Sequence, residues 1–199
     1  MIPGKMLDCL DQSGLATNTL VLYTSDQGVF LGEHGLYDKR FMYEESLQMP
    51  LLVRWPGQVK AGSVNRDLVS NIDFAPTLLE AAGHPLPGDL QPCSFLPLLR
   101  GKTVADWRDA FCYRYYLSHF NTPPHYGIGT ASHKLIYFHT LNTWELYDLR
   151  HNPSEMKNLA GEPGQASVLQ ALKDRLFNLQ RQLKDDSNDL GDQPRTGLN

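Results

Sequence analysis

The sequence predicts an α/β protein, in which the end of an α/β layer is followed by a small antiparallel sheet with a packed C-terminal helix. Two short apolar runs, at residues 19–24 and 51–54, are typical of strands that are buried on both faces. Apolar stretches at 134–138 and 144–149 flank a short polar link and predict a hairpin. Apolar side chains between 168 and 183 recur at intervals of three and four, which predicts an amphipathic helix.

The first half of the chain also contains helix signals on both sides of the apolar runs. Near the N-terminus, three apolar side chains share a helical face, namely Met6, Leu7 and Leu10. Gly14 follows them and is predicted to end this helix. Residues 41–47 predict a short helix. Asp73 is a predicted N-cap for a helix that continues to Ala82.

The second half changes in character, because residues 110–117 are rich in aromatic side chains and predict a further strand. The hairpin and the last helix are expected to pack together, since neither is stable alone in water. We therefore expect an α/β part over 1–105, an α+β subdomain over 106–184 and a disordered tail over 185–199.

Bulk composition excludes several classes of protein. The formal net charge is −4 and the basic runs are short, which argues against a nucleic-acid-binding surface. No apolar stretch approaches the roughly 20 residues of a membrane span, and the N-terminal residues contain no secretory hydrophobic region. The 3 cysteines are far apart and lack C-x-x-C spacing, so neither a disulfide framework nor a zinc site is expected.

A set of charged side chains follows the first apolar run. Asp26 and Gln27 come directly after it, where an open α/β sheet binds ligands. A carboxylate and an amide both provide oxygen ligands for a hard cation such as Ca²⁺ or Mg²⁺. Lys39 could reach an anionic oxygen in the same crevice. The alternative is an ordinary S-D-x-G turn, and spacing alone leaves both interpretations open.

The ordered combination of motifs resembles the sulfatase family of the alkaline phosphatase superfamily. The main stretch is "YTSDQGVFLGEHGLYDKRFMYEESLQMPLLVRWPG", and the resemblance continues through "NIDFAPTLLEAAG", "SFLPLLRG", "HYGIGTASHKLIYF" and "WELYDLRHNPSEMKNLA". It covers about Thr19 to Ala160 and is similar to bacterial sulfatases that act on sulfated sugars, including N-acetylglucosamine-6-sulfatases. It implies an alkaline-phosphatase-like α/β layer, with residues 1–105 as the C-terminal part of the catalytic domain.

The resemblance also implies roles for individual residues. Asp26 and Gln27 match two ligands of a divalent cation, usually calcium, with Mg²⁺ as the alternative. Lys39 matches the lysine that contacts the sulfate group. His34 lies in the L-G-E-H-G segment, where it either contacts the sugar or braces the loop.

The resemblance also bears on four further residues. Arg40 either helps to bind an anionic substrate or, as the favoured alternative, forms a structural salt bridge. Glu44 and Glu45 are expected to support the loop. His125 lies where members of the family bring a C-terminal loop toward the substrate, and it is expected in a surface loop and as a possible substrate ligand.

The sequence departs from the family pattern in ways that bear on catalysis. The nucleophile of the family lies in C-x-P-S-R, whose cysteine becomes formylglycine, and none of Cys9, Cys93 and Cys112 stands in such a motif. The aspartate pair that completes the cation site is missing as well. "GIGT" has Gly129 where the family usually has arginine. The chain is therefore expected to be a C-terminal sulfatase fragment that is inactive alone, with formylglycine only in an N-terminal part outside it.

Three functions remain open at this point. The favoured one is a sulfatase fragment whose partner is a sulfated carbohydrate, such as a glycosaminoglycan. The second is a phosphatase or phosphonate monoester hydrolase of the same superfamily. The third is a non-catalytic carbohydrate-binding or interaction module. Association through exposed sheet edges is also expected. Localisation is unknown from the chain, although the family suggests a periplasmic or secreted protein.

Overall fold

A computed structural model describes residues 2–88, 93–118 and 121–185. The chain forms two compact units, and each is described by itself. The first unit comprises Met1–Asp26 and Met49–Arg108, and the second comprises Gln27–Gln48 and Asp109–Asn199. The predicted tail lies almost entirely outside the described residues. No helix in the described part of the chain is long and apolar enough to cross a membrane.

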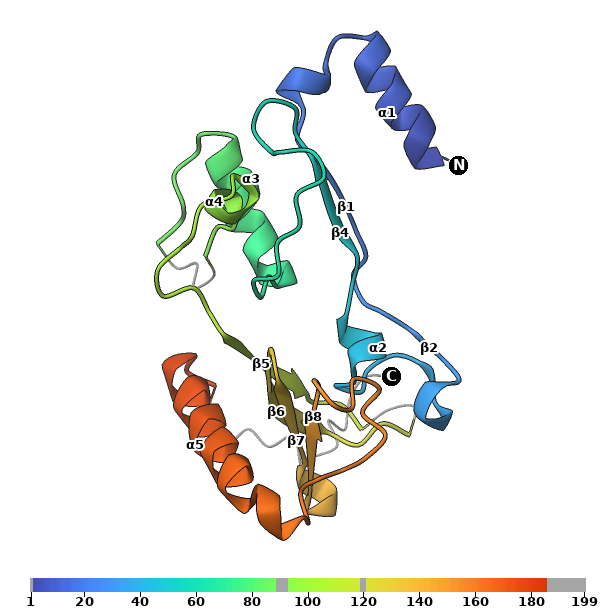
Figure 1. The fold of residues 1–199 in the computed structure, drawn as a ribbon, viewed down its shortest axis with the longest axis vertical. Helices are drawn as coiled ribbons and strands as arrows, with labels where there is room; N and C mark the ends of the chain where they lie inside the picture. Colours follow the sequence, from blue (N-terminus) through green and yellow to red (C-terminus); the bar gives the residue numbers. More distant parts are fainter. Residues whose placement is uncertain (1, 89–92, 119–120, 186–199) are drawn as a thin grey trace, which may run out of the picture. The chain divides into compact units, whose positions relative to one another are not determined.

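The first unit combines helices with a two-stranded antiparallel ladder (Figure 1). Its elements are α1 (Ile2–Gln12), η1 (Ala16–Asn18), β1 (Val21–Thr24), β4 (Leu51–Arg54), η3 (Asn71–Asp73), α3 (Phe74–Ala81) and α4 (Leu96–Leu99). Gly14 follows α1 with φ +72°, a conformation that suits glycine and confirms the predicted stop. Both predicted strands are present, and Val21 pairs with Arg54.

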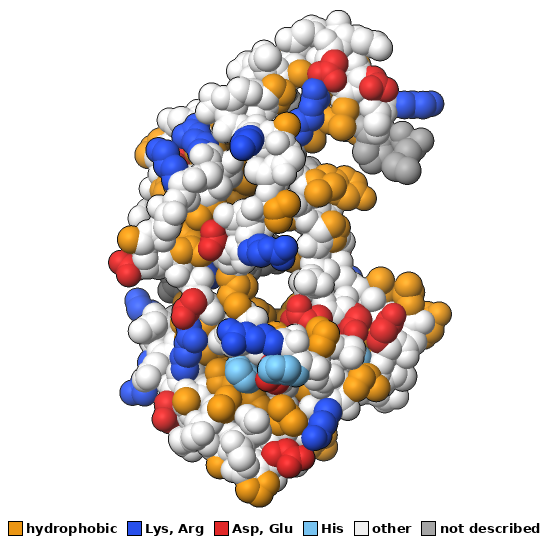
Figure 2. Space-filling view, viewed as in Figure 1, with side chains coloured by type: hydrophobic (Ala, Val, Ile, Leu, Met, Phe, Trp, Pro, Cys, Tyr) orange, Lys and Arg blue, Asp and Glu red, His pale blue; other side chains and the backbone are white. Residues whose placement is uncertain are grey.

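The prediction that these strands are buried on both faces is wrong for the described residues. Tyr23 and Leu52 are cross-strand partners, and their exposed fractions are 51% and 63%. Figure 2 shows hydrophobic side chains on the surface of the protein. An apolar run indicates where a strand forms, whereas its burial depends on what packs on each face.

Asp73 precedes α3 as predicted, but its side chain makes no capping bond to that helix. Its carboxylate accepts the Ser70 N–H at 2.8 Å and binds the Arg108 guanidinium through two bonds of 2.6 and 2.7 Å. The helical segment begins one short turn earlier, with Ser70 and Asp73 forming a capping box. The predicted N-cap position is therefore occupied by Ser70, while Asp73 completes the capping box and forms a buried ion pair with Arg108.

The second unit is built on a four-stranded antiparallel sheet in the order β5-β6-β7-β8 (Figure 1). Its elements are β2 (Phe30–Leu31), η2 (Glu33–Gly35), β3 (Tyr37–Asp38), α2 (Glu44–Leu47), β5 (Ala110–Tyr115), β6 (His125–Thr130), β7 (His133–Phe138), η4 (His139–Leu141), β8 (Thr143–Asp148), η5 (Pro163–Gln165) and α5 (Ala166–Gln182). The predicted strand at 110–117 and the hairpin are confirmed.

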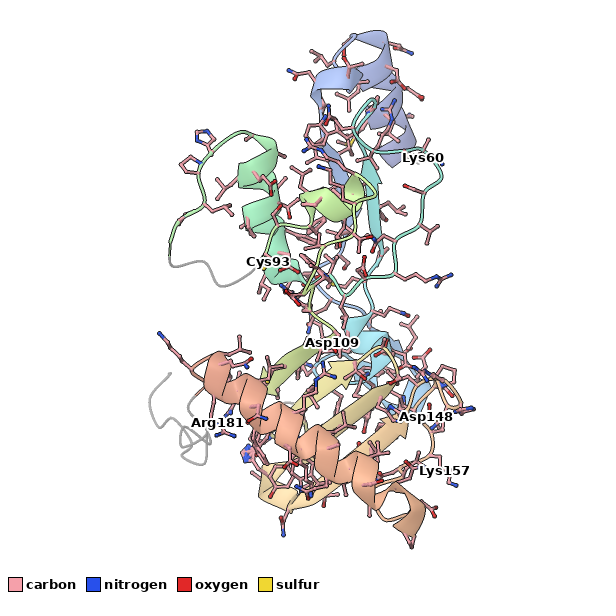
Figure 3. The ribbon with its side chains drawn as sticks, turned by 60° about the vertical axis from the view of Figure 1, so that its left-hand side comes forward. Lys60, Cys93, Asp109, Asp148, Lys157 and Arg181 are labelled. Carbon is pink, nitrogen blue, oxygen red and sulfur yellow. The ribbon has the colours of Figure 1, made fainter. Side chains whose placement is uncertain are left out.

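Helix α5 packs on one face of this sheet, and Figure 3 shows it crossing the strands. Leu172 and Leu176 of α5 share a core with Leu135 of β7 and Leu146 of β8. The expected packing of the hairpin against the last helix is therefore confirmed.

The opposite face of the sheet is covered by Gln27–Gln48. Phe30, Met42 and Tyr43 share a second core with Ile136 and Phe138 of β7. The structure thus groups the charged loop with the C-terminal sheet, although the sequence analysis included it in the part over 1–105. The division into a catalytic part and a subdomain stays a prediction.

Strand β6 was missed by the sequence analysis, because two glycines in "HYGIGT" are unfavourable in a strand. The structure explains Gly127, because a Cβ at this position would lie 2.2 Å from the Leu135 carbonyl oxygen and 2.7 Å from the Met42 sulfur. At Gly129, a Cβ would lie 2.3 Å from the Phe111 ring. Phe111 thus occupies the space beside the position where the sequence pattern of the family has arginine.

Candidate functional site

The candidate site is the loop between β2 and α2, which carries His34, Lys39 and Arg40. The Glu33 carboxylate accepts the Leu31 N–H at 2.6 Å and closes the turn that leads into η2. His34 has φ 55°, a left-handed conformation that is uncommon for a non-glycine residue. The local sequence therefore builds a tight, irregular loop.

The ring of His34 is enclosed by neighbours from the same segment. It stacks on the Tyr43 ring at a centroid distance of 4.3 Å and meets the Phe30 ring edge-on at 6.1 Å. Its Nε2 lies 3.4 Å from the Glu45 carboxylate, and its side chain is 10% exposed. These contacts agree with the bracing alternative for His34, while a sugar contact stays a prediction.

Lys39 is half-buried and lies between two residues with positive φ. Asp38 has φ 80° and Arg40 has φ 100°. The side chains of these two neighbours form a salt bridge with each other. The favoured alternative for Arg40, a structural salt bridge, is therefore observed, and contacts of Lys39 or Arg40 with substrate stay predictions.

The predicted support by Glu44 and Glu45 is confirmed, because Glu45 contacts His34 and Glu44 binds a buried lysine. That lysine is Lys134 of β7, which is fully buried and lies 2.6 Å from Glu44 and 2.8 Å from Glu155. Glu155 also accepts the Glu44 N–H at 2.7 Å. Sequence reasoning missed this cluster, although a lysine at the start of an apolar strand is a usable signal for a buried ion pair.

The two predicted cation ligands are consecutive in the sequence and belong to different units. Asp26 is exposed and ends the first stretch of one unit, and Gln27 is half-buried and begins the other. The donor types fit a hard cation, but the described residues contain no group of three or more histidine, cysteine or acidic side chains that could hold a metal ion. A crevice shared by Asp26, Gln27 and Lys39 stays a prediction.

His125 is the first residue of β6 and is fully buried, so its predicted place in a surface loop is wrong. Its ring stacks on Phe41 at 5.8 Å and on Tyr113 at 5.6 Å, which are aromatic neighbours that the sequence could not place together. Its Nδ1–H donates to the Pro123 carbonyl at 2.8 Å, whereas Nε2 is buried with no hydrogen-bond partner in the described structure. Its role as a substrate ligand stays untested.

Burial lowers the pKa of His125 to about 4, although its bond to the Pro123 carbonyl acts in the opposite direction. The unfolded chain protonates this histidine near a pKa of about 6.5. The unfolded state therefore binds more protons below that pH, and stability is lost as the pH falls from about 6.5 toward about 4.

We expect the protein to lose about 3 kcal/mol of unfolding free energy over this interval through His125 alone. Urea unfolding at a series of pH values measures this loss. In the control variant His125→Asn, the amide replaces the Nδ1 donor without titrating, and the variant should lose less stability over the same interval. An equal loss in the variant would contradict the assignment.

The surface pockets in the described part of the second unit include two on different sides of the sheet. One of about 350 Å³ is lined by Glu44, Glu45, Gln48, Pro153 and Ser154. The other, of about 410 Å³, lies between the β6–β7 turn and α5 and includes His133 and Arg175. The first pocket adjoins the supports of the candidate loop through Glu44 and Glu45, whereas the second is on the α5 side of the sheet.

Comparison with known proteins identifies the family. A family model described as N-sulphoglucosamine sulphohydrolase, C-terminal, matches residues 32–182, a range that includes the candidate loop, the sheet and α5. The chain belongs to this sulfatase family. The sulfatase resemblance of the motifs is thereby confirmed, and so is the correspondence to a C-terminal portion.

Sequence identity and structural superposition show how similar the chain is to individual sulfatases. The chain is 46% identical over 191 residues to the N-acetylglucosamine-6-O-sulfatase of Bacteroides thetaiotaomicron, covering 94% of this chain and 34% of the relative. The structure of BT4656 in complex with its substrate D-glucosamine-2-N,6-O-disulfate matches with a TM-score of 0.89 and 45% identity, covering 94% of this chain and 39% of that one.

A second kind of neighbour is the phosphonate monoester hydrolase of Agrobacterium radiobacter, with a TM-score of 0.80, 26% identity, and coverage of 90% of this chain and 38% of that one. This chain spans about a third of the length of the Bacteroides thetaiotaomicron N-acetylglucosamine-6-O-sulfatase. The predicted fold class, an alkaline-phosphatase-like α/β layer followed by an antiparallel sheet and helix, is confirmed.

Proposed function

We propose that this chain provides the sulfate-binding lysine and part of the cation site of a sulfatase that acts on 6-O-sulfated glucosamine-type sugars. The observation that supports this most is the 46% identity to an N-acetylglucosamine-6-O-sulfatase across nearly the whole chain. The match to a structure that contains D-glucosamine-2-N,6-O-disulfate points to the same class of substrate.

In this proposal the Lys39 ammonium group binds a sulfate oxygen and stabilises the negative charge that develops during hydrolysis. Arg40, His34 and His125 are the candidates for contacts with the sugar. Asp26 and Gln27 would hold the divalent cation, calcium rather than Mg²⁺, which when bound polarises the sulfate. Calcium takes about six to eight oxygen ligands, so other groups must complete the site.

The chain contains no C-x-P-S-R motif. We therefore propose that the nucleophile comes from a segment outside these residues. The chain by itself should be inactive, because it has no group that can attack the sulfate and form the covalent intermediate. A sulfatase of this kind would be periplasmic or secreted, as the resemblance suggests.

A phosphonate monoester hydrolase is the second candidate, because such an enzyme shares the fold. The lower identity of 26% makes it the weaker proposal. A non-catalytic carbohydrate-binding module is the third, and it predicts sugar binding with no dependence on a nucleophile supplied from elsewhere.

The test is to titrate the chain with N-acetylglucosamine-6-sulfate and with phenylphosphonate in the presence of calcium, and to assay hydrolysis in parallel. We expect weak binding of the sulfated sugar, weakening about tenfold or more in Lys39→Ala, since a charge-assisted bond contributes about 1.5–3 kcal/mol. Lys60→Ala is the control, because Lys60 is an exposed lysine of the other unit (Figure 3).

Hydrolysis by the chain alone, abolished in Lys39→Ala, would contradict the proposed origin of the nucleophile. Preference for phenylphosphonate would favour the second candidate. Equal sugar binding by Lys39→Ala and the unchanged chain would refute the role of Lys39. Fusion to the N-terminal part of the Bacteroides thetaiotaomicron relative should create sulfatase activity under the first proposal and none under the third.

A further inference from the structure

The backbone on both sides of Lys39 adopts an unfavourable conformation. Asp38 and Arg40 both have positive φ, at 80° and 100°. For residues other than glycine, such conformations persist only where surrounding contacts hold them, and they cluster at functional sites. The contacts that hold Arg40 therefore determine how the chain presents Lys39.

Both polar groups of the Arg40 backbone are held by side chains from other elements. Its N–H donates to the Ser46 hydroxyl at 3.2 Å, and its carbonyl accepts the Tyr113 hydroxyl at 2.7 Å. Ser46 belongs to α2, and Tyr113 belongs to the sheet strand β5. Two independent elements thus hold the peptide groups on either side of one strained residue.

Ser46 is itself held firmly. It is fully buried, and its backbone carbonyl accepts the Gly28 N–H at 2.9 Å. The backbone of Gly28 lies so close to α2 that a Cβ on Gly28 would be 1.9 Å from the Glu45 carbonyl oxygen. Ser46 can therefore act as a fixed point for the Arg40 N–H.

Tyr113 is held by ring contacts. Its ring stacks on the buried His125 at 5.6 Å with an interplanar angle of 27°. Burial raises the pKa of Tyr113 to about 12, so its hydroxyl remains a donor at neutral pH. The hydroxyl that donates to the Arg40 carbonyl therefore belongs to a side chain with little freedom to move.

We propose that Tyr113 and Ser46 are positioning residues that fix the strained Arg40 backbone and thereby place Lys39. The functional consequence rests on the proposed role of Lys39 in sulfate binding. The positioning itself is independent of that role, because it concerns the conformation of Asp38 and Arg40 with no ligand present.

The test compares Tyr113→Phe, Ser46→Ala and the double variant by NMR. A residue with positive φ gives a strong NOE between its own amide proton and Hα, so this signal at Arg40 reports the conformation. We expect each single variant to weaken the Arg40 signal and to lower the affinity for D-glucosamine-2-N,6-O-disulfate roughly three- to tenfold. The double variant should lose less than the product of the single effects, because both bonds restrain the same residue.

Tyr147→Phe is the matched control, because it removes a phenol hydroxyl of the same unit that donates to Glu145 at 2.9 Å and not to the Arg40 backbone. It should lower thermal stability about as much as Tyr113→Phe while leaving the Arg40 signal and the sugar affinity unchanged. Unchanged Arg40 signals in both single variants, or equal changes in the control, would overturn the proposal. If the signals change but sugar affinity is the same in Lys39→Ala and the unchanged chain, the positioning stands and the sulfate-binding role falls.

Discussion

Lys134→Ala is expected to destabilise the protein by about 3–5 kcal/mol, because it removes one partner from a buried ion cluster. Lys134 is fully buried, and its ammonium group bonds to Glu44 at 2.6 Å and to Glu155 at 2.8 Å. Glu155 is buried as well, so the variant leaves its carboxylate without a compensating cation. The same cluster joins α2 to the sheet, so the candidate loop should loosen too.

This loss should depend on pH in a defined direction. Burial already raises the pKa of Glu155, while the Lys134 charge lowers it. Without Lys134 the folded-state pKa of Glu155 rises further, so its neutral form is favoured in the folded protein. The stability of the variant is then retained below the unfolded-state pKa of about 4.3 and lost as the pH rises, and its deficit relative to the original protein is larger at pH 7 than at low pH.

Urea unfolding of both proteins at acid and neutral pH measures this deficit. Lys157→Ala is the matched control, because Lys157 pairs with Glu162 at 3.6 Å with a side chain that is 70% exposed. Such a surface pair contributes about 0–1 kcal/mol. A deficit for Lys134→Ala as small as that of the control, or one that does not grow with pH, would show that the cluster is not a stabilising element.

Gly127→Ala is expected to cost about 3 kcal/mol or more, at the upper end of the range for overpacking. The added methyl group would lie 2.2 Å from the Leu135 carbonyl oxygen and 3.1 Å from the Ile136 Cα. Both contacts are with the backbone of the neighbouring strand β7, which cannot move aside without breaking the sheet. Met42, whose sulfur would lie 2.7 Å away, should also be displaced from the sheet face.

Two alanine variants are matched controls for this steric effect. Gly129→Ala places its methyl group 2.3 Å from the end of the Phe111 side chain, which can rotate, so its cost should be smaller. Gly161→Ala meets nothing within 4 Å and should be nearly neutral. Urea unfolding gives the three costs, and the NMR shift of the Met42 methyl group reports displacement of the loop. Similar costs for Gly127→Ala and Gly161→Ala would refute the close approach.

The sequence by itself determined the elements whose signals are local. The apolar runs predicted β1 and β4, the two apolar stretches around a polar link predicted the hairpin β7–β8, and the spacing of apolar side chains predicted α5. The ordered motifs also determined the family. These inferences succeeded because side-chain periodicity and turn residues act within a few positions along the chain.

Only the tertiary structure decided which faces are covered and which polar groups meet. It placed glycine-containing β6 in the middle of the sheet, buried His125 and paired Asp73 with Arg108. It also brought Glu44 and Glu155, which are 111 positions apart in the sequence, to the same lysine. Contacts of this kind depend on how strands and loops distant in sequence pack together, and no local pattern of residue types encodes that packing.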